Sequence, residues 1–311
     1  MSQVGDKSEH APVLDLLEAV DLDRRGAAAV GAWLAGHRAD LVAGVRACDR
    51  DGVRRAGLRL AGAAWAAAGL VPEPRWWAEL AEAGEALAIA ERDPEALVGL
   101  LDAAAAVFAD HGDRVRAEER WVRALSVARR AGSPGQDRLL VALAGLYRGW
   151  GRLGKALDAQ WALVELRAAA GDALGSALAR AEVGATMHAA GRTASAVEHL
   201  ERAQEAAALA GAGPVEHARL LVWCGWARWA QGGPGAAKRC WSRALALLVD
   251  VDEDAAQRVR DLLAHGPGDG ATAPYLSTGA SSSDSSSSAG APTSGRTGSP
   301  NTASSPSGGA G

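Results

Sequence analysis

The residue types that most often carry chemistry are present in this chain, but they lack the spacing that catalytic or metal sites require. None of the seven histidines is followed four residues later by another with a carboxylate between them, so a zincin-type zinc helix is not indicated. The Gly-x-Ser-x-Gly order of a nucleophile elbow is absent before residue 266. Cys48, Cys224 and Cys240 are an odd set without close spacing, which suggests neither a disulfide framework nor a zinc site. We therefore expect no enzyme activity, no metal and no cofactor.

One string imitates a nucleotide-binding loop. Residues 149–155 fit the order Gly-x4-Gly-Lys, ending at Lys155. Phosphate binding by such a loop needs a preceding strand, and a Ser or Thr after the lysine to hold magnesium. Ala156 stands there instead. The glycines are better explained as the turn between two helices.

Three tryptophans, Trp223, Trp226 and Trp229, recur at intervals of three residues. Side chains three apart on a helix are neighbours, so the indoles would form a nearly continuous ridge. Tryptophan is heavily buried on average, and a row at this spacing usually packs against a neighbouring helix pair. A core role is therefore one interpretation of the row.

The elements that must position these residues come from a pattern that recurs four times. Each copy has an alanine, a second residue four positions later and a third after three more, and a glycine precedes each copy by five residues. The copies begin at Ala117, Ala156, Ala196 and Ala237. A period near forty residues in an Ala-rich chain indicates stacked helical hairpins. Strand-forming residues are scarce apart from Val and Trp, so the chain is predicted to be all-helical.

Helix pairs are predicted at 94–110 with 113–131, 135–150 with 152–170, 173–190 with 193–211, and 214–231 with 234–250. An earlier, degenerate pair is predicted at 52–70 and 73–92, aligned by placing Ala86 in register with Ala124. Residues 24–49 are expected to form one bent helix or two short ones, and 255–264 a terminal helix.

Four regions follow from this pattern: a disordered leader at 1–11, a divergent helical region at 12–92, the array at 93–265 and a disordered tail at 266–311. The leader is polar and shows no secretory signal. The tail is rich in Ser, Gly and Thr, and no core can be built from it. Its serine run at 281–288 could be a phosphorylation target or part of a flexible tether, and the composition favours the tether.

The triplets, each with a small residue twelve positions upstream, resemble the tetratricopeptide repeat. The upstream residues are Ala105, Ala144, Gly184 and Gly225. The resemblance covers residues 94–250 and implies a right-handed superhelix, or solenoid, whose small residues let paired helices approach closely. The second copy departs from the family, with Gln160 at the bulky position and Leu163 at the last alanine. The stretched period resembles the arrays that end actinobacterial signal-transducing ATPase regulators, although the ATPase part itself is absent.

The resemblance also implies a concave groove along the first helices of the pairs. Its predicted lining is Gly99, Arg138, Arg148, Leu178, Ala185, His188, Arg219, Trp226 and Trp229. Among these, Arg138, Arg148, His188, Arg219, Trp226 and Trp229 form the predicted partner-binding site. Guanidinium groups bind carboxylates in pairs of hydrogen bonds and indoles give apolar anchorage, so an extended peptide with acidic and hydrophobic side chains would fit. The alternative is that the arginines pair with Glu and Asp of adjacent helices.

The chain is therefore expected to be a non-catalytic protein- or peptide-binding scaffold or adaptor in the cytoplasm, with a possible regulatory role. The alternative is a sensor module whose groove takes a small molecule or a signalling peptide. A net charge of -4 and a pI near 6.0 argue against nucleic acid as a partner. The longest uncharged runs, 26–37 and 60–72, are too short to span a membrane.

Overall fold

The computed structural model describes residues 27–50, 52–66, 71 and 73–267. The predicted leader at 1–11, the first part of the predicted helical region at 12–26 and nearly all of the predicted tail, from 268 on, lie outside the described residues. All regular structure within the described ranges is helical. The N-terminal helices are α2 (Ala27–Gly36), α3 (Arg38–Arg50), α4 (Arg54–Ala66) and α5 (Pro74–Ala90). Within the predicted segment 24–49, the described residues, from Ala27 on, thus form two short helices and not one bent helix.

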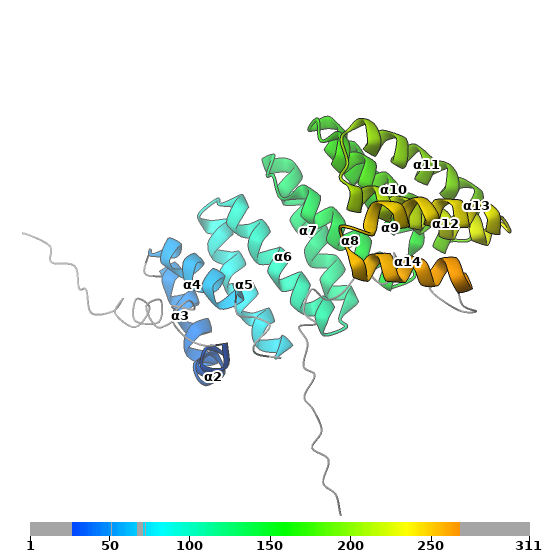
Figure 1. Ribbon diagram of the computed structural model, residues 1–311. Helices are drawn as coiled ribbons and strands as arrows, with labels where there is room; N and C mark the ends of the chain where they lie inside the picture. Colours follow the sequence, from blue (N-terminus) through cyan, green and yellow to red (C-terminus); the bar gives the residue numbers. More distant parts are fainter. Residues whose placement is uncertain (1–26, 51, 67–70, 72, 268–311) are drawn as a thin grey trace, which may run out of the picture. The chain divides into compact units, whose positions relative to one another are not determined.

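The regular array follows α5 as four helix pairs and a terminal helix (Figure 1). The pairs are α6 (Pro94–Asp110) with α7 (Arg114–Ala131), α8 (Gln136–Gly149) with α9 (Leu153–Ala169), α10 (Ala173–Ala189) with α11 (Thr193–Leu209), and α12 (Pro214–Ala230) with α13 (Pro234–Leu248). The terminal helix is α14 (Glu253–His265). These bounds agree with the predicted pairs to within two residues at most ends.

From α6 on, each helix packs chiefly on the helices just before and after it in the chain, whereas α5 also packs on α3, and α6 on α4. The closest packing lies within the pairs α6–α7, α10–α11 and α12–α13, and few contacts skip a helix. One continuous row of buried side chains runs from Val30 to Val259. This arrangement, in which each unit buries its apolar face only against its neighbours, is an all-α solenoid.

Turns between helices are set by glycines and by capping carboxylates. The turn inside each pair holds a glycine with positive φ, at Gly112, Gly151, Gly191 and Gly232. L-residues with a side chain rarely adopt this conformation, so the predicted helix-breaking glycines are confirmed. Side chains of Asp93, Asp113, Asp172 and Asp252 accept a backbone N–H in the first turn of the helix that follows each.

Small residues on the first helix of a pair face bulky residues on the second. A Cβ atom added to Gly184 would lie 2.9 Å from Cγ of Leu200, and one added to Gly225 would lie 2.2 Å from Nε1 of Trp241. Leu200 and Trp241 are fully buried. The prediction that small residues allow close helix approach is confirmed at both pairs.

The register predicted for the earliest pair is wrong by two residues. Ala86 is exposed, whereas Gly84 lies between helices, where an added Cβ would be 3.0 Å from Leu100 and 3.3 Å from Ala61. Glycine stands at Gly84 where the later copies have alanine. Alignment on alanine therefore placed the exposed Ala86 in the buried position. Trp77 and Ala81, both fully buried, continue this register toward the helix start.

The string that imitates a nucleotide-binding loop is the turn between α8 and α9, as predicted. A helix and not a strand precedes it. Nζ of Lys155 lies 2.5 Å from Glu118 of α7, which also accepts hydrogen bonds from Tyr147 and Arg152. Burial, followed by the hydrogen bond to Glu118, raises the pKa of Tyr147 to about 12. The side chain of Lys155 therefore forms an ion pair with a carboxylate of the protein itself.

A membrane-spanning candidate is lacking as well: among the helices of the described ranges, none combines the length and the apolar character that crossing a bilayer requires.

Candidate functional site

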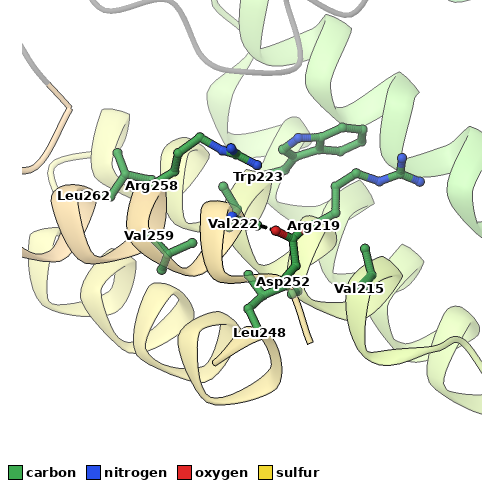
Figure 2. A pocket seen from close by; sticks show the side chains of 11 residues that line it. Val215, Arg219, Val222, Trp223, Leu248, Asp252, Arg258, Val259 and Leu262 are labelled. Carbon is green, nitrogen blue, oxygen red and sulfur yellow. Dashed lines mark hydrogen bonds between the residues drawn. The ribbon is translucent and has the colours of Figure 1, made fainter. Parts of the chain in front are cut away.

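Two pockets open on the surface formed by the first helices of the pairs, and they share Arg219 and Trp223 of α12. We call them the apolar pocket and the polar pocket. The apolar pocket has a volume of about 320 Å³ and lies between α12 and α14 (Figure 2). The polar pocket has a volume of about 310 Å³ and is bounded by α8, α9, α10 and α12. Because they share two side chains, the pockets adjoin along α12.

The apolar pocket is walled by aliphatic side chains from three helices. These are Val215, Ala218 and Val222 of α12, Leu248 of α13, and Ala255, Val259 and Leu262 of α14. The carboxylate of Asp252 accepts the backbone N–H of Ala255 at 2.9 Å, so it caps α14. Arg219 and Arg258 are exposed at the rim, and Figure 2 shows the guanidinium of Arg258 extending toward Trp223. An apolar floor with a cationic rim results.

The polar pocket holds three arginines and one carboxylate. Nη1 of Arg148 lies 2.8 Å from Oε2 of Glu182, and Arg167 donates to the carbonyl of Gly175 at 3.2 Å. The guanidinium of Arg219 lies 5.5 Å from the ring centre of Trp223, within cation–π range.

The charge of this surface is opposite in sign to that of the chain. The two pockets together hold four arginines (Arg148, Arg167, Arg219, Arg258) and two carboxylates (Glu182, Asp252), a surplus of two positive charges. The whole chain carries a net charge of -4. An anionic ligand group is therefore attracted to this surface.

Gln160 of α9 supplies the polar pocket with an unusual group. Its side chain is only 2% exposed, and its Oε1 has no hydrogen-bond partner among the described residues. The equivalent position holds Trp121, Leu200 and Trp241 in the other three pairs, all of them buried. A buried acceptor without a partner costs free energy, which a ligand that brings an N–H or O–H donor would recover.

The structure brings together part of the predicted site. Arg148, Arg219 and Leu178 all line the polar pocket. Arg138 lies elsewhere: its Nη2 is 2.8 Å from Oδ2 of Asp102 on α6. Arg138 therefore follows the alternative prediction, in which the arginines pair with carboxylates of adjacent helices. Arg148 does both, since it pairs with Glu182 and also lines the polar pocket.

The indoles of Trp226 and Trp229 line neither pocket. Trp226 is 8% exposed and belongs to the core. Trp229 stacks on Trp241 with ring centroids 5.7 Å apart, and Gly266, just after α14, lies against its other side. Trp226 and Trp229 therefore pack as parts of the core and not as groove residues, because α14 and the residue after it cover this end of α12. Trp223 is the tryptophan of the row that reaches both pockets.

His188 also lies outside both pockets. It is half-buried on α10, and this burial lowers its pKa. Protonation of His188 can therefore affect stability, but its side chain does not line either pocket.

Two features of the site were missed from the sequence. Gln160 was noted only as a departure from the repeat, although a polar residue at a bulky core position is itself a signal. The contribution of Arg258 and Leu262 was missed because α14 was treated only as a cap. Among the described residues, no group of three or more His, Cys, Asp and Glu side chains is arranged to hold a metal ion.

Comparison with known proteins does not assign the chain to a family. No protein-family model matches the sequence, and no curated protein matches it. Among solved structures, the chain is similar to the crystal structure of BtubC (BKLC) from P. vanneervenii, with 16% sequence identity and a TM-score of 0.49. The alignment covers 84% of this chain and 94% of that chain. The assignment to an all-α solenoid therefore rests on the helix packing described above.

Proposed function

We propose that the chain is a non-catalytic scaffold that binds an extended peptide segment with acidic and apolar side chains across the wall that Arg219 and Trp223 form between the two pockets. The observation that carries the proposal is the adjacency of an apolar pocket and a cationic pocket on one helix surface. The tetratricopeptide-like triplets support it, because arrays of stacked hairpins present extended binding surfaces. We place the scaffold in the cytoplasm, since none of its three cysteines, all of which lie within the described residues, is joined in a disulfide.

The apolar pocket would take one large aliphatic or aromatic side chain. Its lining from Val215, Val222, Val259 and Leu262 is almost wholly hydrocarbon. Burying a Leu-, Ile- or Phe-sized side chain contributes about 1.5–3 kcal/mol. This contact anchors one point of the peptide.

The arginines would take the acidic side chains beside that anchor. Within the described residues, Arg219 and Arg258 are exposed and make no ion pair. A guanidinium fork binds a carboxylate through two parallel hydrogen bonds. An Asp or Glu next to the apolar residue therefore complements the rim.

Gln160 would fix the peptide in the polar pocket. A peptide backbone carries an N–H donor at every residue except proline. One such group entering the pocket would satisfy Oε1 of Gln160, which the protein leaves without a partner.

Selection from a random peptide library displayed on phage, with the full chain as bait, tests the proposal. Enriched peptides should combine Asp or Glu with a large apolar residue a few positions away. A synthetic peptide of the enriched sequence, followed by fluorescence polarisation, should bind Arg219→Ala about tenfold or more weakly, since a hydrogen bond to a charged group is worth about 1.5–3 kcal/mol. Arg129→Ala is the matched control, because Arg129 is exposed on α7 and lines neither pocket. Absence of enrichment, or equal affinity for both variants, would overturn the proposal.

A further inference from the structure

Two cysteines meet across the last helix pair. Cys224 of α12 and Cys240 of α13 lie close enough for each thiol to shift the pKa of the other. Cys224 is 1% exposed, whereas Cys240 is half-buried. Each cysteine directly precedes a member of the tight contact between Gly225 and Trp241, so the two helices are held close at this level.

The groups around the thiols stabilise a negative charge. Arg228, one turn further along α12, lies near Cys224 and pairs with Glu201, and Gln204 of α11 lies near Cys224 while its Nε2 donates to the carbonyl of Leu220. Cys240 and, less strongly, Arg228 lower the pKa of Cys224 to about 6, against the effect of burial. The proximity of Cys224 raises the pKa of Cys240, which keeps its proton. Near neutral pH the pair therefore carries one proton and one thiolate, and a thiolate is the reactive form of cysteine.

We propose that Cys224 and Cys240 form a reversible disulfide, joining α12 to α13, when the chain meets a hydroperoxide. A disulfide requires two cysteines on neighbouring backbone segments, and the contact between Gly225 and Trp241 places the segments that carry Cys224 and Cys240 side by side. The proposal does not depend on peptide binding, since it involves the α12–α13 contact and not the pockets.

The reaction balances with hydrogen peroxide as the oxidant. Transfer of the Cys240 proton to the Cys224 thiolate gives a thiolate at the more exposed Cys240, and this sulfur attacks a peroxide oxygen. The O–O bond breaks, one water leaves after protonation, and the sulfur becomes a sulfenic acid. The sulfur of Cys224 then attacks it, the S–O bond breaks, the S–S bond forms and a second water leaves. Two thiols and one peroxide give one disulfide and two waters, and a dithiol reductant reverses the change.

Mass spectrometry of the full chain tests this. After treatment with a small excess of hydrogen peroxide, unfolding and alkylation with N-ethylmaleimide, only one of the three cysteines should be alkylated. Peptide mapping should show Cys224 joined to Cys240, and dithiothreitol should restore three alkylated cysteines. The melting temperature of the oxidised chain should rise by about 5–10 °C, as expected for a bond that closes a short loop.

Matched variants separate the pair from the third cysteine. Cys48→Ser should keep the peroxide-induced bridge, whereas Cys224→Ser and Cys240→Ser should lose it. Because Cys48 is fully buried in α3, circular dichroism must first show that its variant folds. The wild-type peptide map stands even if a variant does not fold. Three alkylated cysteines after peroxide, sulfinic acid at Cys240 without a bridge, or a bridge only between two chains would each overturn the proposal.

Discussion

Gly225 of α12 lies directly against the indole of Trp241 on α13, so closely that a Cβ atom at Gly225 would come within 2.2 Å of Nε1. The indole is fully buried, and its N–H donates to the carbonyl of Val222 at 3.3 Å. It cannot withdraw from an added methyl group without losing this hydrogen bond. The separation of α12 and α13 is therefore set by the absence of one side chain.

Gly225→Ala should lower the free energy of unfolding by about 1–3 kcal/mol, since overpacking a tight core outweighs the gain in helix propensity. Urea denaturation followed by circular dichroism measures this. Gly99→Ala is the matched control, because Gly99 is exposed on α6 and an added Cβ would meet nothing within 4 Å. That variant should be neutral or more stable by up to about 1 kcal/mol. Equal stability of the two variants would contradict this account of the contact.

Gln160→Leu should raise the free energy of unfolding by about 1 kcal/mol, because it removes a buried acceptor that has no partner. Leu200 occupies the equivalent position two helices later, so leucine suits this site in the repeat. The same variant should bind the selected peptide more weakly, in the fluorescence assay described above. A variant that gained stability and kept full affinity would show that Gln160 does not contact the peptide.

The solenoid could be predicted in detail from the sequence, whereas the site could be predicted only in part. Spacing of Ala, Gly and bulky residues fixes which helix faces are buried, and these are local properties. Which arginine faces a carboxylate and which faces solvent depends on residues a whole helix pair away. Arg138 and Asp102 are 36 positions apart and Arg148 and Glu182 are 34 apart, and one repeat pattern fits either outcome. The burial of Trp229 likewise depends on how the terminal helix α14 packs against α12, which the repeat pattern does not specify.

Glu85→Ala should lower the free energy of unfolding by about 3 kcal/mol, because removing one member of a buried ion pair leaves the other charge without compensation. Glu85 of α5 is 5% exposed and forms ion pairs with Arg120 and Arg123 of α7. Glu253→Ala, which breaks an exposed pair with Arg260, should change stability by about 1 kcal/mol or less. A larger loss for Glu253→Ala than for Glu85→Ala in the same denaturation experiment would refute this ranking.

Acidification from pH 7.5 to pH 5 should destabilise the array through His188 and His199. Burial lowers the pKa of both histidines below 6.5, and Arg180 and Arg202 lower that of His199 further. The unfolded chain therefore takes up protons first as the pH falls through 6.5, and the free energy of unfolding decreases with it. Thermal melts across this range would measure the slope.

A double variant, His188→Gln with His199→Gln, should reduce the slope between pH 7.5 and pH 5, and the slope that remains comes from Cys224, whose lowered pKa of about 6 also falls within this range. The carboxylates with lowered pKa, Glu118, Asp113 and Glu253, titrate below this range, so they do not obscure the result. An unchanged slope in the double variant would assign the effect to other groups.

Packing that involves mainly consecutive helices also determines where the chain opens. Opening one end of such a row breaks only one interface between neighbours, so end units exchange their amide hydrogens faster than central ones. Within the described residues, the α12–α13 pair is followed only by α14, with which it shares a smaller contact than the pairs have internally. Transient detachment of α14 and the residue after it would uncover Trp229. A covalent bond between α12 and α13 would then act as a latch near this end of the row.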